Sequence, residues 1–383
     1  MSSSGPSPSN VPASPPEVIV LRVGCVRRGL TVLTWSYLLF LVALWIAFPL
    51  IGERNVTVAA LLYVPPLLWL LPGAPLGLLL LCFRGMRRWA AVLALAAGFH
   101  GLVHAGYEFH AGSPPARPGE GTFTVLTYNR GEQGKIPLND FVARTDPDVV
   151  VMQDAEGRGA FYRKAEGFLQ FPHHREQGEF LVLSRWPIVG AGPLVPMTPP
   201  PKAGGDRPQP HAAARFEIDR GGQRLAVYAY HAMTPRPELK NYRRGAFLYG
   251  VLGLVPGTAW SERRAALQSF WDARIADVRA LLDALAGEGL PYVVAGDFNA
   301  PANGYIGRLL RSRLADAHDE AGSGWGFSFP GVTNNPLALF RPWLRIDYVL
   351  AGPHWEVEHC LTERDRPSQH HCVTAWLRPR PPR

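Results

Sequence analysis

Apolar residues dominate the first third of this 383-residue chain and are broken into short runs afterwards. Three apolar stretches come first, at about residues 30–51, 56–83 and 89–107. A helix needs roughly 20 apolar residues to cross a bilayer, so the first two stretches are long enough and the third is at the lower limit. The pattern therefore predicts three transmembrane helices. A cleaved signal peptide explains it poorly, because the apolar stretch is too long and more apolar sequence follows.

The same pattern divides the chain into four parts. Residues 1–20 are rich in Ser and Pro, a composition that predicts disorder. Residues 21–107 form the predicted membrane anchor, and residues 108–121, rich in Pro and Gly, form a linker. Residues 122–378 carry short apolar runs punctuated by Gly and Pro, which indicates a globular domain with buried strands.

Six apolar runs in this globular part predict strands, and one long stretch predicts a helix. The runs are FTVLTYN, DVVVMQD, EFLVLSR, RLAVYAYH, PYVVAGDFN and RIDYVL. Residues 261–286 predict the helix, because apolar residues recur there at spacings of three and four. Ser261 is a favourable N-cap for this helix, and Gly287 is expected to end it.

The positions of the charged residues predict the orientation of the anchor in the membrane. Three arginines at positions 22–28 precede the first span, and three more at positions 84–88 lie between the second and third. The loop between the first two spans carries only Glu53 and Arg54. Because cationic loops stay in the cytoplasm, three spans predict a multi-pass protein of the cell membrane whose globular domain is extracytoplasmic. If residues 89–107 do not span, the domain is cytoplasmic instead.

Overall charge and cysteine content exclude few classes of function. The net charge of +8 suits nucleic acid, anionic lipid head groups or phosphorylated substrates, but Arg-rich and Pro-rich stretches produce such a charge without any partner. Four cysteines are too few for a disulfide scaffold, and no Cys/His spacing indicates zinc. Cys360 and Cys372 are able to pair only if their strands are neighbours.

Polar side chains end several of the predicted strands. In chain order they are Asn129, Asp154, His231, Asp297, Asn299, Asp347 and His370. Each alone has an ordinary explanation as a turn former, a helix cap or an exposed loop residue. Together they favour a site, because polar groups are costly to bury unless they converge on a ligand or on one another. Asn, carboxylates and His without Cys indicate Mg²⁺ or Mn²⁺ and phosphate chemistry.

The order of these motifs resembles the endonuclease/exonuclease/phosphatase superfamily, and most of all its bacterial membrane-anchored branch. The matching segments are TYN at 127–129, PDVVVMQD at 147–154, SRWPI at 184–188, YAYH at 228–231, GDFNAP at 296–301, SFP at 328–330, RIDYVL at 345–350 and SQH at 368–370. The resemblance implies an α+β fold, a four-layer α/β/β/α sandwich of two packed sheets flanked by helices, preceded here by the three spans.

The resemblance also implies catalytic roles. His231 donates to the phosphoryl oxygens, and Asp297 orients or deprotonates the attacking water. Asn299 holds Asp297 or the phosphate. His370 stabilises the pentavalent transition state, and Asp347 holds its ring in the required tautomer. These roles follow the general logic of phosphoryl transfer, in which catalysis comes from positioning and charge neutralisation.

On the metal side, the resemblance implies that Asp154 binds the metal and that Asn129 contacts metal or phosphate. Two positions depart from the family pattern. The family's metal-binding Glu is here Asp154, one methylene shorter, and its terminal Ser-Asp-His is here Ser368-Gln369-His370. Glu156 either substitutes for the longer carboxylate or belongs to the following loop. The site is therefore expected to have about one negative charge less and to bind metal more weakly.

The implied function is that of a membrane-anchored Mg²⁺-dependent (or Mn²⁺-dependent) phosphoesterase. Residues 235–260 form an insertion with the apolar run GAFLYGVLGLVPGTAW, which lies in the lipid interface, covers the site as a lid, or packs as a helix on the domain. An interfacial insertion favours a lipid-linked phosphate or pyrophosphate as substrate. The alternatives are a nuclease of the same fold, which lacks the expected basic stripe with interleaved aromatics, and a catalytically weakened binding module. No protein partner is inferred.

Overall fold

A computed structural model describes residues 17–110, 121–131, 138–197, 211–236, 253–254, 256–332, 342–364 and 369–381. Most of the predicted disordered N-terminus, most of the predicted linker and much of the 235–260 insertion lie outside the described residues, as does Ser368.

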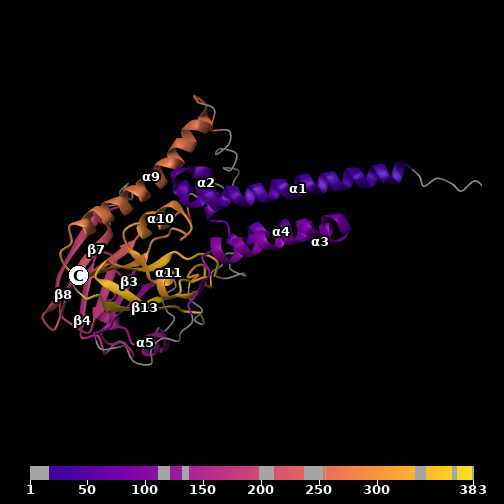
Figure 1. The fold of residues 1–383 in the computed structure, drawn as a ribbon. Helices are drawn as coiled ribbons and strands as arrows, with labels where there is room; N and C mark the ends of the chain where they lie inside the picture. Colours follow the sequence, from indigo (N-terminus) through magenta and orange to yellow (C-terminus); the bar gives the residue numbers. More distant parts are fainter. Residues whose placement is uncertain are drawn as a thin grey trace, which may run out of the picture.

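Two mixed six-stranded sheets form the globular part (Figure 1). The first sheet has the order β13 (Trp355–Thr362), β14 (Val373–Pro379), β2 (Phe123–Asn129), β3 (Val149–Gln153), β5 (Phe180–Ser184) and β4 (His173–Gln177). The second has the order β10 (Ala315–Asp316), β12 (Asp347–Ala351), β9 (Tyr292–Asp297), β8 (Gln223–His231), β7 (His211–Arg220) and β6 (Ile188–Pro196). Each sheet has one parallel pair, β2 with β3 and β8 with β9.

One apolar core joins the two sheets, and helices cover their other faces. Alternate strand residues such as Val125 and Val293 pack between the sheets. The helices α9 (Ala259–Ala286) and α10 (Tyr305–Arg311) cover the second sheet. The shorter α5 (Asn139–Thr145) and α6 (Gly159–Tyr162) cover the first. The helix α11 (Ala317–Ala321) and the small sheet of β1 (Glu108–Phe109) with β11 (Ser323–Gly324) complete the described elements of the globular part. Two mixed sheets with helices agree with the predicted sandwich.

The predicted strands and the long helix are confirmed with small shifts. All six apolar runs contain a strand. The long helix α9 begins at Ala259 rather than Ser261, because Thr258 is the N-cap and its side chain accepts a hydrogen bond from the Ser261 N–H. It ends at Gly287, as expected.

The pairing of Cys360 with Cys372, left open by the sequence, does not form. The strands β13 and β14 are neighbours, as pairing would require, but Cys360 and Cys372 are both free and buried. They belong to different apolar clusters, Cys360 to the core between the sheets and Cys372 to the cluster under α5.

The first third is helical, but three separate spans are not confirmed. Its elements are α1 (Glu17–Leu50), η1 (Gly52–Arg54), α2 (Val56–Leu62), η2 (Pro66–Leu70), α3 (Gly73–Leu81), η3 (Arg84–Met86), α4 (Arg87–Gly98) and a π-helix η4 (Phe99–His104). Within the described residues, one helix, Gly24–Leu50, is long and apolar enough to cross a membrane. A second candidate span exists only if Val56–Leu62 and Pro66–Leu81, whose axes differ in direction by 93°, together form one broken span.

The shortfall has a physical cause. Pro65, Pro66 and Pro72 interrupt the second apolar stretch, because proline donates no backbone hydrogen bond and clashes with the preceding turn. The third stretch is divided between the 12-residue α4, which begins with two arginines, and the 6-residue η4. At 1.5 Å per residue, α4 alone is much shorter than a bilayer core of about 30 Å.

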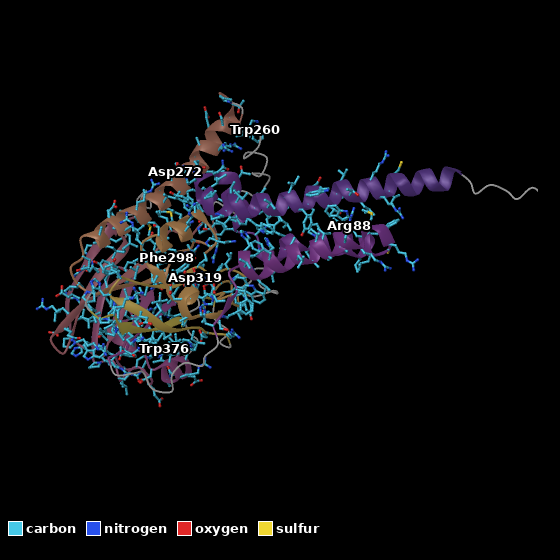
Figure 2. The ribbon with its side chains drawn as sticks, viewed as in Figure 1. Arg88, Trp260, Asp272, Phe298, Asp319 and Trp376 are labelled. Atoms are coloured by element: carbon cyan, nitrogen blue, oxygen red, sulfur yellow. The ribbon has the colours of Figure 1, made fainter. Side chains whose placement is uncertain are left out.

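These helices form one module that packs on the globular part (Figure 1). Leu30 of α1 packs against Leu80 and Leu93 at the end of the module distant from the sheets. Figure 2 shows Arg88 in this outer region and Phe298 inside the globular part. At the near end, Phe48 and Tyr63 share an apolar cluster with Trp271 of α9 and Trp343. The predicted anchor and domain therefore contact each other directly through a common core.

Candidate active site

Strand register brings three of the predicted residues into line. His231 on β8 and Asp347 on β12 are both cross-strand partners of Asp297, which ends the strand β9 between them. Asn129 ends β2 of the other sheet, and its side-chain NH₂ donates to Asp297 Oδ2 at 2.9 Å. The candidate site therefore lies where the ends of central strands from both sheets meet.

Asp297 is the centre of this group and is almost completely buried, with 1% of its side chain exposed. Its Oδ1 accepts from the Asn299 N–H at 2.7 Å, and its Oδ2 accepts from the Asn299 side chain at 3.1 Å. The same Oδ2 lies 3.7 Å from His231 Nε2 and 3.8 Å from His370 Nδ1. Burial, reinforced by the charge of Asp347, raises the pKa of Asp297 to about 6. A carboxylate with such a pKa is suited to accept a proton near neutral pH.

His370 is held by Asp347, in the arrangement that the sequence predicts. Its Nδ1 lies 3.0 Å from Asp347 Oδ2. Burial by itself would lower the pKa of His370, but the carboxylates of Asp347 and Asp297 outweigh it and raise the pKa. Phe329 packs against the imidazole at 4.8 Å, and the Ser328 hydroxyl accepts from the Asp347 N–H at 3.2 Å. The SFP segment thus supports both members of the pair.

Two polar side chains outside this group, Arg345 and His100, have well-defined partners. Arg345 does not pair with Asp347. It donates to Asp316 at 2.6 Å and to Asp319 at 2.5 Å instead. In the anchor, His100 accepts from Trp45 Nε1 at 2.9 Å and lies 2.9 Å from the Pro66 carbonyl, so it joins α1 to the start of η2.

His231 has a carboxylate partner that the sequence analysis missed. Its Nδ1 lies 3.0 Å from Glu179 Oε2, at the turn between β4 and β5. Burial by itself would lower the pKa of His231, but Glu179, Asp297 and Asp154 outweigh it and raise the pKa to about 10. Each histidine of the site is therefore oriented by its own carboxylate, and the neighbouring carboxylates favour its protonated form. Glu179 belongs to none of the recognised motifs, and its only sequence signal is its place at the start of a predicted strand.

Two groups of side chains have the composition of a metal site. Ligand atoms of Asp154, Glu179 and His231 all lie within 4.8 Å of one another, as do those of Asp297, Asp347 and His370. Only the first group includes a solvent-exposed member, Asp154. Its oxygen donors fit a hard divalent cation such as Mg²⁺ or Mn²⁺.

The remaining metal-side predictions have mixed outcomes. Asn129 accepts from the Gly131 N–H at 2.8 Å while donating to Asp297, so only one lone pair of its oxygen is left for a ligand. Glu156 is exposed and belongs to neither group, so it does not take the place of the longer carboxylate. The side-chain oxygen of Gln369 lies over Gly131, where a Cβ would be 2.8 Å away.

The turn after β9 is fixed from outside the family motifs. Asn299 adopts a left-handed conformation with φ of 48°, which is uncommon for a residue other than glycine. Its carbonyl accepts from Arg274 Nη2 at 2.8 Å and from the Tyr63 hydroxyl at 2.6 Å. Arg274 also donates to the Phe298 carbonyl at 3.0 Å and to the Tyr63 oxygen at 3.0 Å. Arg274 comes from α9, and Tyr63 follows α2 of the helical module.

A second contact joins the helical module to the segment after this turn. Glu53, which is completely buried, accepts from the Ile306 N–H at 3.2 Å in the first turn of α10. The N-cap position, Gly304, has no side chain to satisfy that turn, and a Cβ there would be 2.6 Å from Leu62. Glu53 therefore caps α10 from another part of the chain.

Together these contacts place the buried carboxylate of Asp297 between the imidazoles of His231 and His370, each of which has a second carboxylate partner. Such an arrangement is able to orient a water molecule through Asp297 and to neutralise a developing charge through His231 and His370.

The chain matches the model of the Endonuclease/Exonuclease/phosphatase family over residues 126–370. Among solved structures, it is similar to an endonuclease/exonuclease/phosphatase from Beutenbergia cavernae at 20% identity, covering 69% of this chain and 72% of that chain with a TM-score of 0.45. It is also similar to humanized D. rerio TDP2 (14% identity, 67% and 99% covered, TM-score 0.46) and to the human Nocturnin catalytic domain with bound sulfate (14%, 68% and 94%, 0.42). These structural similarities are weak, so the assignment rests on the family match. No curated protein matches the chain significantly.

Proposed function

Because the chain belongs to the endonuclease/exonuclease/phosphatase family, we propose that it is a metal-dependent phosphoesterase of a membrane that hydrolyses a phosphate ester carried by a lipid. The observation that supports hydrolysis most strongly is the buried Asp297 between His231 and His370, each histidine held by its own carboxylate. Such a constellation provides the positioning and the charge neutralisation on which attack by water on a phosphoryl group depends.

In the proposed reaction, Asp297 orients the attacking water and accepts its proton. Asn129 and Asn299 hold the Asp297 carboxylate in place through three hydrogen bonds. His231 and His370 donate to the phosphoryl oxygens as charge accumulates there, and Glu179 and Asp347 orient the two rings and favour their protonated forms.

The metal-side residues of this reaction are Asp154 and Asn129. These residues would hold a divalent cation, which would supply Lewis-acid polarisation of the phosphoryl oxygen.

Exposed apolar side chains support membrane attachment. Leu33 and Leu39 on α1 are 58% and 62% exposed, and Leu78 and Leu95 on the neighbouring helices are 67% and 75% exposed. Such side chains are expected to face lipid rather than water. We propose residues 21–107 as the anchor, 1–20 as a disordered N-terminus, 108–121 as the linker and 122–378 as the catalytic domain.

The place of the active site supports a lipid substrate. Tyr63, which touches the catalytic turn, is separated from the end of the long apolar helix α1 only by η1 and α2. The site therefore lies near the predicted membrane surface, where a lipid head group is within reach. Figure 2 shows Arg88 in the outer part of the module, away from the catalytic domain. With the consecutive helices α4 and η4 as the third crossing, this position favours an extracytoplasmic domain in a multi-pass protein.

The proposal is tested by comparing substrates on the purified full-length chain in detergent with Mg²⁺ or Mn²⁺. The panel contains lipid pyrophosphates, lipid monophosphates, phospholipids, sugar phosphates and plasmid DNA, and Asp297→Ala is the control. We expect the highest kcat/KM on a lipid-linked phosphate or pyrophosphate and almost none in Asp297→Ala. Preference for DNA would overturn the lipid part, and equal release by both proteins would overturn the phosphoesterase itself.

A further inference from the structure

The metal side of this site departs from the family pattern at two positions. Asp154 is one methylene shorter than the Glu that the family carries there, and Gln369 is neutral where the family carries Asp. Both changes remove negative charge or withdraw it from the position of a cation. By the family pattern alone, the chain would be expected to bind a divalent cation weakly.

The structure places another carboxylate at this position. Glu179 lies immediately before β5, and its carbonyl accepts from the Ala155 N–H at 2.9 Å, which fixes the turn beside Asp154. Its carboxylate lies 3.0 Å from His231 Nδ1, and ligand atoms of Glu179, Asp154 and His231 all lie within 4.8 Å of one another. The two carboxylates thus share the mouth of the site, with the solvent-exposed Asp154 outermost.

We infer that Glu179 is a metal-binding residue of this chain and replaces the charge lost at positions 154 and 369. This inference rests on the proposed function, because it names a residue of the same site. Asp154 has a left-handed backbone with φ of 54°. The carboxylates of Asp154 and Glu179 are close enough to repel each other unless a cation or a proton lies between them. A divalent cation relieves this repulsion, and one carboxylate from each strand compensates for the shorter side chain.

A purely structural role makes a different prediction. If Glu179 serves only to hold His231, a glutamine keeps that contact, because its amide oxygen accepts from Nδ1 as the carboxylate does. If Glu179 binds the cation, the same substitution removes a charged ligand and lowers metal affinity. Glu179→Gln therefore separates the two roles.

The test is Mn²⁺ binding by full-length protein in detergent, followed by calorimetry and by the electron paramagnetic resonance of free Mn²⁺. We expect Glu179→Gln to weaken binding at least tenfold relative to wild type. The control is Glu356→Gln, which removes the same charge from a 2.8 Å ion pair between Glu356 on β13 and Arg378 on β14 and should bind as wild type does. Asp154→Glu added to Glu179→Gln should recover part of the affinity, because it restores the family's longer carboxylate.

Two further readouts keep the result interpretable. The Mn²⁺-induced rise in unfolding temperature should shrink in Glu179→Gln, while its unfolding temperature without metal stays close to that of the control. Unchanged Mn²⁺ affinity in Glu179→Gln, or no binding by wild type, would overturn the inference. If wild type hydrolyses no phosphoester but binds Mn²⁺ through Glu179, the proposed function fails and the inference stands. If hydrolysis requires metal but Glu179→Gln leaves the Mn²⁺ affinity unchanged, the inference fails and the proposed function stands.

Discussion

Replacing Tyr63 by Phe tests whether the helical module is part of the catalytic apparatus or only an attachment. The change removes one hydroxyl and keeps the ring that packs 5.5 Å from Trp271. Two hydrogen bonds are lost, the one from Tyr63 to the Asn299 carbonyl and the one from Arg274 to the Tyr63 oxygen. The first contributes about 1 kcal/mol, and the guanidinium N–H left without an acceptor costs about 1–3 kcal/mol more.

We expect this loss to appear mainly in kcat. The Asn299 carbonyl belongs to the turn that orients Asp297, and about 1.4 kcal/mol corresponds to a tenfold change in rate. We therefore expect kcat to fall by roughly ten- to a hundredfold, with little change in KM, because Tyr63 contacts the backbone of the turn.

The assay is steady-state hydrolysis by full-length protein in detergent. Tyr37→Phe is the matched control, because the Tyr37 hydroxyl donates to the Trp69 carbonyl at 2.8 Å within the helical module. Equal kcat values in Tyr63→Phe and Tyr37→Phe, with both proteins folded, would refute the coupling between module and turn.

Two other predictions concern pH and stability. Wild-type activity should rise as pH passes through about 6, where Asp297 loses its proton, and fall at alkaline pH, where His231 loses its proton at about 10. Asp347→Asn removes a charge that raises the pKa of both Asp297 and His370. The acidic limb of the activity profile and the pH at which His370 loses its proton should therefore both move to lower pH. A profile that does not move would contradict the pairing of Asp347 with these two residues. Glu53→Ala leaves the Ile306 N–H without its acceptor and should lower the free energy of unfolding by about 1–3 kcal/mol, measured by thermal unfolding against Glu356→Ala, which should change it by less than about 0.5 kcal/mol.

Local sequence patterns predict much of this fold. Strands buried on both faces appear as continuous apolar runs, and α9 shows its apolar spacing and its terminal glycine directly. The anchor is harder to predict, because hydropathy alone does not show how Pro65, Pro66 and Pro72 break a long apolar stretch. The contact between anchor and domain depends on side chains such as Phe48 and Trp271, which are far apart in the sequence.

The residues of the candidate site are likewise predictable from the sequence only in part. His231, Asp297 and Asp347 are detectable because each ends a predicted strand, and register then makes them neighbours. Glu179 and Tyr63 are not detectable in this way. Glu179 reaches His231 across 52 residues of sequence, and Tyr63 reaches Asn299 across 236. Tyr63 carries no local signal, and Glu179 shows only its place at the start of a predicted strand, because each residue acts through a partner that the folded chain provides.

Asp297→Asn is the most direct test of the central claim that this site hydrolyses phosphate esters with a metal. Asparagine keeps the size of the side chain but accepts a proton poorly and carries no charge. We predict that wild type hydrolyses its best phosphoester only with Mg²⁺ or Mn²⁺, and that Asp297→Asn lowers kcat by about 10²–10⁴-fold. Hydrolysis that persists after metal chelation, or that is equal in wild type and Asp297→Asn, would contradict the claim.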